Sequence, residues 1–326
     1  MSEILKKEHI GGDVDEALRP CRLEDYFGQD KVKKNVSVFI KSAKIRCTHL
    51  DHLLFYGPPG TGKTTIANII ACEMGKNIKT TSGPAIDKPG DLASMLMDIQ
   101  DGDILFIDEI HRLPKPVEEV LYSAMEDFAI DILVGDNNSS KAIRLPLPKF
   151  TLIGATTKAG SIAAPLRDRF GSINRLELYE PVVLADIIKR DAAILKIGIT
   201  DEGAMEIALR ARGTPRIAIR LLKRVLDFAV VDGSDTISKD IACEALDSLG
   251  IDRYGLDDND RRLLKAISVS FNGGPVGIET LASFIGEDIV TIEDVCEPFL
   301  MQCGFISKTP RGRVITADGE KYIKKT

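Results

Sequence analysis

Gly57-Pro58-Pro59-Gly60-Thr61-Gly62-Lys63-Thr64 fits the pattern G-x-x-x-x-G-K-[ST], which is typical of a loop that binds phosphate. Before the loop, the apolar residues 53–56 predict a short buried strand, and after it residues 65–72 predict a helix. The motif binds phosphate in this context of strand, loop and helix. Residues 57–64 are therefore expected to form a nucleotide site, and a glycine-rich turn without a ligand is the disfavoured alternative.

The residue types in the loop suit polyphosphate chemistry. Gly57, Gly60 and Gly62 allow tight backbone turns that direct N–H groups into one concavity, at the positive end of the following helix. Lys63 is expected to reach the β- and γ-phosphates of ATP, and the Thr64 hydroxyl group is expected to bind Mg²⁺.

A second apolar run ends in two carboxylates. Residues 104–107 predict a buried parallel strand, and Asp108 and Glu109 follow at its carboxyl end, where open α/β sheets bind ligands. Asp108 is expected to complete the shell of Mg²⁺, and Glu109 to polarise the attacking water, which favours hydrolysis over binding alone. A solvated acidic pair is the alternative, and the position of the pair after a phosphate-binding loop disfavours it.

Composition limits the class of protein. The chain has 326 residues, of which 44% are hydrophobic and 28% charged, as expected for a soluble chain of two or three domains. No apolar run reaches the ~20 residues of a membrane span, and the first residues lack a signal-peptide core, so we expect a cytoplasmic protein. The 6 cysteines form no CxxC pair, which indicates reduced thiols. Because the net charge is −6, a contact with nucleic acid requires a local basic patch.

The order of the predicted elements divides the chain into three domains. Residues 1–180 predict an α/β domain with a parallel sheet, residues 181–252 a small helical domain without strands, and residues 253–326 a winged helix with a β-ribbon. Further strands are predicted at 78–82 and 150–155, and the helices at 30–47, 91–99, 117–128, 184–197, 201–212, 213–231, 238–249, 258–271, 276–285 and 291–303.

Capping residues predict where three of these helices begin. Asp30 is expected to cap the helix 30–47, and Thr200 the second helix of the small domain. Pro215 suits the first turn of the third helix, which also places Arg216 in that turn.

Residues 130–147 predict a β-hairpin, because two apolar arms flank a turn-rich centre. A hairpin that projects from a sheet is only marginally stable, so its apolar side chains require a partner. These side chains either contact a partner protein or pack on the parent domain, and the sequence leaves both interpretations open.

The β-ribbon of the third domain carries Lys308, Arg311 and Arg313 beside Gly312. Three basic groups this close together, in an otherwise acidic chain, favour contact with DNA phosphates over an ordinary charged turn. The basic face of residues 31–46 is a second surface of this kind, and its simplest interpretation is solvation.

Together these motifs resemble the AAA+ ATPase family. By that likeness Thr157 corresponds to the polar sensor on the next strand, Arg169 to the trans arginine finger, and Arg216 to the second sensor on the lid. Within the family, the chain is particularly similar to the bacterial motors of Holliday-junction branch migration. The similar segments follow one another in order across all three domains, at 53–65, 80–84, 105–113, 124–127, 152–157, 165–171, 212–218, 273–277, 292–295 and 309–313.

The resemblance implies a motor for DNA recombination and repair, with defined partners. Six subunits would form a ring around duplex DNA at a four-way junction, with ATP and Mg²⁺ between neighbours and Arg169 touching the γ-phosphate of the next subunit. A junction-binding protein would grip the hairpin 130–147, and a junction resolvase is a further expected partner. The likeness also assigns nucleotide contacts outside the loop, to Leu18, Arg19, Thr65, Glu126, Asp127, Tyr179 and Pro215.

Two other classes of protein share parts of this pattern. A clamp-loader-type ATPase has the same core and an arginine finger, but requires a different third domain. A DNA-binding regulator with a nucleotide switch could carry the same winged helix. ATP turnover that duplex or junction DNA stimulates would distinguish a motor from a switch.

Overall fold

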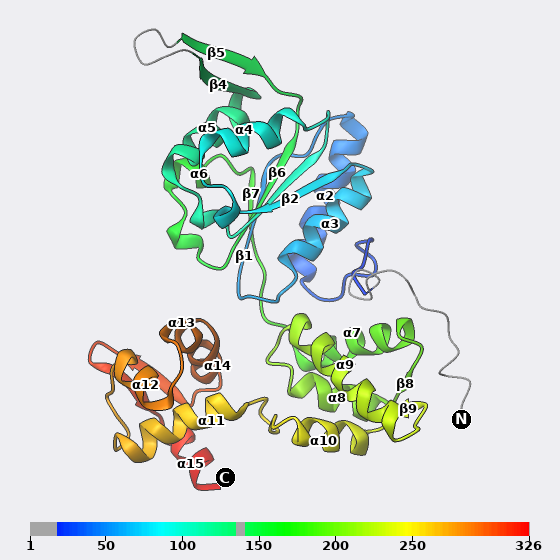
Figure 1. The fold of residues 1–326 in the computed structure, drawn as a ribbon. Helices are drawn as coiled ribbons and strands as arrows, with labels where there is room; N and C mark the ends of the chain where they lie inside the picture. Colours follow the sequence, from blue (N-terminus) through cyan, green and yellow to red (C-terminus); the bar gives the residue numbers. More distant parts are fainter. Residues whose placement is uncertain (1–17, 135–140, 326) are drawn as a thin grey trace. The chain divides into compact units, whose positions relative to one another are not determined.

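The computed structural model describes the backbone of residues 18–134 and 141–325 (Figure 1). Side chains are described for residues 18–131 and 143–325. The chain folds into two units. The first contains residues 1–195 and 214–216, and the second residues 196–213 and 217–326. The predicted three-domain division at residues 180 and 252 stays a prediction.

Five parallel strands form the sheet of the first unit. In the order β2-β3-β6-β1-β7, they are β2 (Ile78–Ser82), β3 (Ile104–Asp108), β6 (Thr151–Thr156), β1 (Leu53–Tyr56) and β7 (Ser172–Arg175). Tyr56 lies opposite Thr156, and Ser82 lies opposite Asp108, so the carboxyl ends of four strands meet at one edge. The predicted parallel sheet is therefore confirmed, whereas β7 was not predicted.

Helices cover both faces of this sheet, as Figure 1 shows. Alternate strand residues point to opposite faces: Phe55 packs with the helices α2 and α3, and Leu54 packs with α4 and α5. The covering helices are α2 (Asp30–Arg46), α3 (Lys63–Met74), α4 (Pro89–Met97), α5 (Lys115–Asp127) and α6 (Ala164–Arg167). The helix α7 (Pro181–Ile194) follows the last strand of the sheet in sequence. The N-cap of α2 is Gln29 with φ 54°, so the prediction that Asp30 caps this helix is wrong.

The hairpin is also confirmed, with strands β4 (Ala129–Val134) and β5 (Lys141–Pro146) pairing antiparallel. Its base packs on the parent domain, because Ile130 is buried in the same core as α5 and Leu145 packs against that core. Ile143 is 45% exposed. The turn at 135–140 lies outside the described residues.

The second unit begins with a small helical bundle made of α8 (Asp201–Leu209), α9 (Pro215–Val231), whose first two residues belong to the first unit, and α10 (Lys239–Ser248). The Thr200 hydroxyl accepts a hydrogen bond from Gly203 N at 3.0 Å, which confirms this cap. The bundle also contains two short paired strands, β8 (Gly198–Ile199) and β9 (Thr236–Ile237), so the prediction of helices without strands is wrong.

A winged helix completes the second unit. Its helices are α11 (Asp258–Lys265), α12 (Ile278–Ile285), α13 (Ile289–Thr291), α14 (Glu297–Gln302) and α15 (Ala317–Lys325), with π-helical turns at Ala266–Ser270 and Ile292–Cys296. The predicted ribbon is confirmed as β10 (Ile306–Thr309) and β11 (Gly312–Ile315), and α15 was not predicted. Val276 pairs with Arg313, and a Cβ atom on Gly312 would lie 2.4 Å from the Val276 carbonyl oxygen. This close approach explains the glycine at position 312.

Candidate nucleotide and DNA sites

The phosphate-binding loop connects β1 to α3, as the motif predicts. Gly57 N donates to the Thr156 carbonyl oxygen at 3.2 Å, which joins the loop to the adjacent strand β6. Gly57 has φ 148°, and a Cβ atom there would lie 2.2 Å from the Leu176 carbonyl oxygen. A side chain at position 57 would therefore collide with the backbone. Thr64 and Thr65, both half-buried, follow in the first turn of α3.

The Lys63 ammonium group lies inside this loop. Its Nζ atom donates to the carbonyl oxygens of Gly57 and Pro58, both at 2.9 Å. Burial lowers the pKa of Lys63 to about 8; nearby Asp108 opposes this shift, and Arg216 adds to it. A phosphate oxygen would be a stronger acceptor than either carbonyl, because it carries negative charge. The structure thus brings Lys63, Asp108 and Arg216 within electrostatic reach of one another.

Asp108 and Glu109 follow one another where β3 ends. Asp108 Oδ1 accepts a hydrogen bond from Glu109 N at 2.9 Å. The backbone of Glu109 is left-handed, with φ 48°, and a Cβ atom on Gly83 would lie 2.4 Å from its carbonyl oxygen. This conformation is uncommon for a residue other than glycine and marks a constrained turn directly after β3. Glu109 Oε2 accepts from Arg112 Nη1 at 2.9 Å, and the Glu109 side chain is 44% exposed.

The structure distinguishes the two threonines at the end of β6. Thr156 is buried, its hydroxyl oxygen lies 2.9 Å from His111 Nδ1, and it accepts a hydrogen bond from Lys158 N at 2.9 Å. Burial lowers the pKa of His111, which favours a neutral ring. Thr157, the sensor by resemblance, is exposed just beyond the strand. The sequence did not predict the contact between Thr156 and His111, which joins the end of β6 to the 3-10 turn Ile110–Arg112 that follows β3.

A pair of tyrosines supports the other side of the loop. The Tyr179 hydroxyl group donates to Tyr26 Oη at 3.2 Å and reaches the Thr61 carbonyl oxygen at 3.3 Å. Burial raises the pKa of both tyrosines. A Cβ atom on Gly62 would lie 3.1 Å from Tyr26 Oη. Tyr179 is therefore at the loop, as the resemblance implies, and Tyr26 is a neighbour that the motifs did not indicate.

The start of α9 also contacts the loop. Arg216 N lies 3.4 Å from the Gly60 carbonyl oxygen, and a Cβ atom on Gly60 would lie 3.1 Å from Arg216 Cβ and 3.4 Å from Thr214 Cβ. Pro215 is the first residue of this helix, so the predicted place of Pro215 and Arg216 in the first turn is confirmed.

Arg190 on α7 holds the first described residues. It donates to the Leu18 carbonyl oxygen at 3.2 Å and to the Asp25 carbonyl oxygen at 2.8 Å. Leu18 is buried and Arg19 is exposed. Arg190 also donates to the buried Asp191 carboxylate beside it, and its contacts with Leu18 and Asp25 could not be predicted because those residues lie more than 160 positions away.

The remaining predicted nucleotide residues form a separate cluster around α5. Arg169 Nη2 donates to Glu126 Oε2 at 3.0 Å, and Arg144 Nη2 of the hairpin donates to Asp127 Oδ2 at 2.5 Å. Asp168 Oδ1, next to Arg169 in sequence, lies 4.0 Å from Arg167 Nε. Glu126 and Asp127 thus lie beside Arg169 and the hairpin, and not with the lysine of the loop.

The ribbon of the winged helix divides its three basic residues into two kinds. Arg311 at the turn is exposed, and Lys308 is 47% exposed and 3.4 Å from Glu293 Oε1. Arg313 is buried and bonds through Nε and Nη2 to the buried carboxylate of Glu297, with Nη2 at 3.1 Å from Oε2. The assignment of Arg313 to DNA is therefore corrected. Its guanidinium group neutralises a buried carboxylate, and Lys308 and Arg311 remain as the groups available to phosphates.

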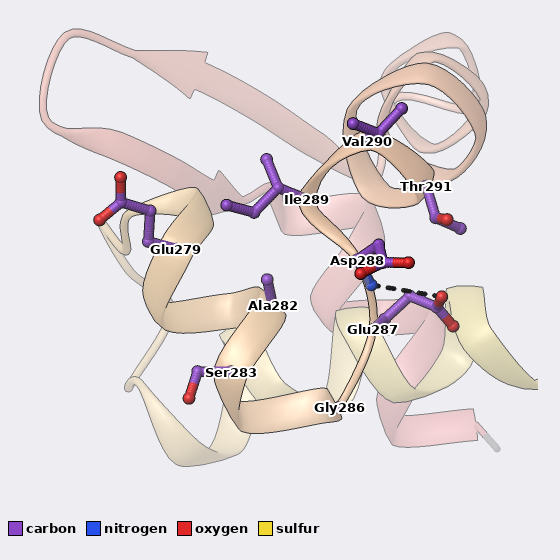
Figure 2. Close-up of a pocket in the computed structure, with 9 residues that line it drawn as sticks. All are labelled: Glu279, Ala282, Ser283, Gly286, Glu287, Asp288, Ile289, Val290 and Thr291. Atoms are coloured by element: carbon purple, nitrogen blue, oxygen red, sulfur yellow. Dashed lines mark hydrogen bonds between the residues drawn. The ribbon is translucent and has the colours of Figure 1, made fainter.

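A hollow of about 790 Å³ lies on the same winged helix, between α12 and α13 (Figure 2). Ala282, Ile289 and Val290 give it apolar walls, and its acidic residues are Glu279 and Asp288 with half-buried Glu287. Carboxylates repel phosphates, so this hollow suits neither a nucleotide nor the DNA backbone. The described residues contain no group of three metal-ligating side chains, and no described helix is long and apolar enough to cross a membrane.

The fold and the site define an AAA+ ATPase, which combines a P-loop parallel sheet, a helical lid and a winged helix. Three family models match the chain. They describe the Holliday junction DNA helicase RuvB P-loop domain at residues 18–176, the RuvB AAA lid domain at 179–252 and the RuvB C-terminal winged helix domain at 253–324. The chain belongs to the RuvB family of Holliday-junction branch-migration ATPases.

Solved structures agree with this membership. The Thermotoga maritima RuvB Holliday junction branch migration motor is 47% identical, with a TM-score of 0.84 over 94% of this chain and 98% of that one. Two mutants of the same protein are 48% identical over the same shares, with TM-scores of 0.85 and 0.86. The predicted family, fold class and ATPase activity are thereby confirmed.

Proposed function

We propose that this chain is one subunit of a hexameric motor that hydrolyses ATP and translocates duplex DNA through Holliday junctions, during recombination and repair. The observation that carries the proposal is the meeting of Lys63, Asp108 and Arg216 around the loop. Arg216 lies in the first turn of α9, the helix that continues into the second unit, which carries the winged helix. A change at the γ-phosphate therefore has a covalent route to the DNA-binding part.

In this proposal, ATP binds to the loop, where the backbone N–H groups and Lys63 hold its phosphates. Thr65 lies beside the phosphates, and Leu18, Arg19, Tyr179 and Pro215 surround the base. Thr64 and Asp108 offer hydroxyl and carboxylate oxygens, which are the ligands that Mg²⁺ prefers. The ion would neutralise phosphate charge. Glu109 accepts the proton of the attacking water, and Thr156 with His111 or Thr157 detects the γ-phosphate.

Arg169 acts on the nucleotide of the neighbouring subunit. Its guanidinium group lies with Glu126 and Asp127 on a surface of α5, away from the Lys63 cluster of its own chain. A positive group that reaches the γ-phosphate across an interface stabilises the charge of the transition state. This division of the site between two chains supports the ring of six subunits.

The hairpin is proposed to bind RuvA, a junction-binding protein, and a junction resolvase is a further partner of the assembly. Ile130 and Leu145 anchor the hairpin on the parent domain, which leaves the 45% exposed Ile143 as an apolar contact. The residues Ile132 and Leu133, whose apolar character first suggested the contact, have side chains outside those described. Lys308 and Arg311 are proposed to hold DNA phosphates without reading bases, which suits a motor that passes over any sequence.

Branch migration of a synthetic four-way junction, resolved on gels, tests the proposed function. We expect migration only with ATP, Mg²⁺ and RuvA together. Ile143→Asp should reduce migration with RuvA while ATPase activity remains, and Glu119→Lys on the exposed side of α5 serves as a charge-change control. ATP turnover that neither duplex nor junction DNA stimulates would contradict the motor and favour a nucleotide switch.

A further inference from the structure

The Arg169 guanidinium group is held by three contacts within its own subunit. It donates through Nη1 to the Pro165 carbonyl oxygen at 2.7 Å and through Nη2 to Glu126 Oε2 at 3.0 Å. Its Cζ atom lies 4.6 Å from the centre of the Tyr122 ring, a distance typical of a cation–π contact. The side chain is only 22% exposed.

The ring that supports Arg169 is itself fixed. Glu118, Tyr122 and Glu126 follow at intervals of four on α5, so they lie on one face of the helix. The Tyr122 hydroxyl group donates to Glu118 Oε2 at 3.1 Å, and Glu118 is buried. Anchored at its hydroxyl end, the ring presents a face to the guanidinium group.

The hydrogen bonds of Arg169 are incompletely satisfied. Its Nε atom is buried and has no acceptor among the described residues. Glu126, the acidic partner, is 56% exposed, so water screens this ion pair and makes it weak. The contact with the Tyr122 ring is made separately from this ion pair, since the ring centre lies 4.6 Å from Cζ whereas Glu126 accepts from Nη2.

We propose that Tyr122 is a positioning residue that aims Arg169 at the neighbouring nucleotide. Glu126 holds the Arg169 guanidinium group until a phosphate replaces the carboxylate of Glu126. The Tyr122 ring keeps the plane of the guanidinium group fixed during this exchange. The inference rests on the proposed role of Arg169 in trans. Because Arg169 is needed most in the transition state, a misplaced guanidinium group should lower kcat and leave KM nearly unchanged.

Three variants of the full chain test this inference with ATP, Mg²⁺ and duplex DNA. Tyr122→Leu removes the ring face and should lower kcat by about tenfold. Tyr122→Phe keeps the ring and should restore most of the activity. Val120→Ala removes packing from the same helix without touching Arg169, so it controls for destabilisation and should keep its kcat. An equal loss in Tyr122→Leu and Val120→Ala would overturn the proposal.

A mixing experiment separates this inference from the role of Arg169. Subunits with Glu109→Gln keep a correctly placed Arg169, whereas subunits with Tyr122→Leu keep an intact hydrolytic site. Mixed rings should therefore turn over faster than either variant alone. If Arg169→Ala itself retains full turnover, the proposed trans role fails. If Arg169→Ala loses on the order of 10³-fold in kcat and Tyr122→Leu loses nothing, only the positioning role is overturned.

Discussion

Arg313 bonds through Nε and Nη2 to the carboxylate of Glu297, and both side chains are buried in the winged helix. Glu297 begins α14 and Arg313 lies in β11, so the ion pair joins a helix to the ribbon. Removing one partner of such a pair leaves an uncompensated buried charge. The pair therefore connects the placement of the ribbon to the stability of the whole winged helix.

Arg313→Ala should destabilise the second unit by about 3 kcal/mol, since the buried Glu297 would lose both hydrogen bonds to Arg313 and keep only the half-exposed Lys308 at 3.9 Å as a positive neighbour. Urea unfolding followed by circular dichroism measures the effect. The paired change Arg313→Met with Glu297→Leu should recover most of the loss, because apolar side chains of similar size can replace a buried ion pair. A single variant as stable as the parent protein would contradict the structural role.

The double change Lys308→Ala with Arg311→Ala should weaken duplex binding equally for every sequence. Each lost phosphate contact lowers the slope of log K against log salt by about 0.9, so we expect a slope smaller by about two. The matched control, Lys324→Ala with Lys325→Ala, removes the same charge from the last turn of α15. An unchanged slope in the ribbon variant would direct attention to the basic face of α2.

The sequence predicted the parts of the fold that local patterns encode. The loop motif with its flanking apolar runs indicated β1 and α3, the apolar run before Asp108 indicated β3, and two apolar arms around a turn-rich centre indicated the hairpin. Strand β7 was not predicted because its burial pattern is the opposite of the usual one: apolar Ile173 is exposed and polar Asn174 is buried, at the sheet edge beside β1. A strand of this kind is recognisable only from its neighbour.

The nucleotide and DNA sites could likewise be predicted only where local residue types indicate the chemistry. Residue type indicated Lys63, Asp108 and Glu109, because phosphate and water chemistry require those groups. Charge alone could not reveal that Arg313 is buried, since Glu297 meets it only after α14 packs on the ribbon. Tyr26, 153 residues from Tyr179 in sequence, carries no local signal for a nucleotide site either.

ATP binding should take up a proton above pH 8. Burial lowers the pKa of Lys63 to about 8 in the protein without nucleotide, and the phosphates would favour the charged form and raise the pKa again. Affinity should therefore fall by about tenfold per pH unit above 8. Calorimetry in buffers of different ionisation enthalpy measures the uptake directly. If the affinity for ATP did not change between pH 7 and 9.5, Lys63 would be shown to stay charged in the protein without nucleotide.

Glu109→Gln should keep nucleotide affinity and lose turnover, because an amide cannot accept a proton from the attacking water. The contact with Arg112 allows an amide in the same place, so the fold should be unaffected. A fluorescent ATP analogue measures binding, and phosphate release measures turnover. Lys63→Ala is the contrasting variant, since it should lose binding itself. Normal hydrolysis by Glu109→Gln would assign the base to another group.

Arg212 and Asp260 join the helical bundle to the winged helix within the second unit. Arg212 Nη2 lies 2.7 Å from Asp260 Oδ2 and 2.9 Å from Asp257 Oδ2, and its Cζ atom lies 4.6 Å from the centre of the Phe299 ring. Asp260 is fully buried, and burial raises its pKa to about 6 against the opposing charge of Arg212. The charged form of Asp260 therefore destabilises the folded state even with Arg212 beside it.

The sign of the pH dependence follows from this raised pKa. Between pH 4 and 6 the folded state binds more protons at Asp260 than the unfolded state, so this group's contribution to stability is lost as pH rises. A shift from 3.8 to about 6 corresponds to about 3 kcal/mol. Asp260→Asn should remove this dependence, so urea unfolding at pH 4.5 and pH 7.5 should differ between variant and parent. Arg212→Ala should cost more at pH 7.5 than at pH 4.5, since protonation relieves the unpaired carboxylate. An equal cost at both pH values would show that Asp260 does not titrate in this range.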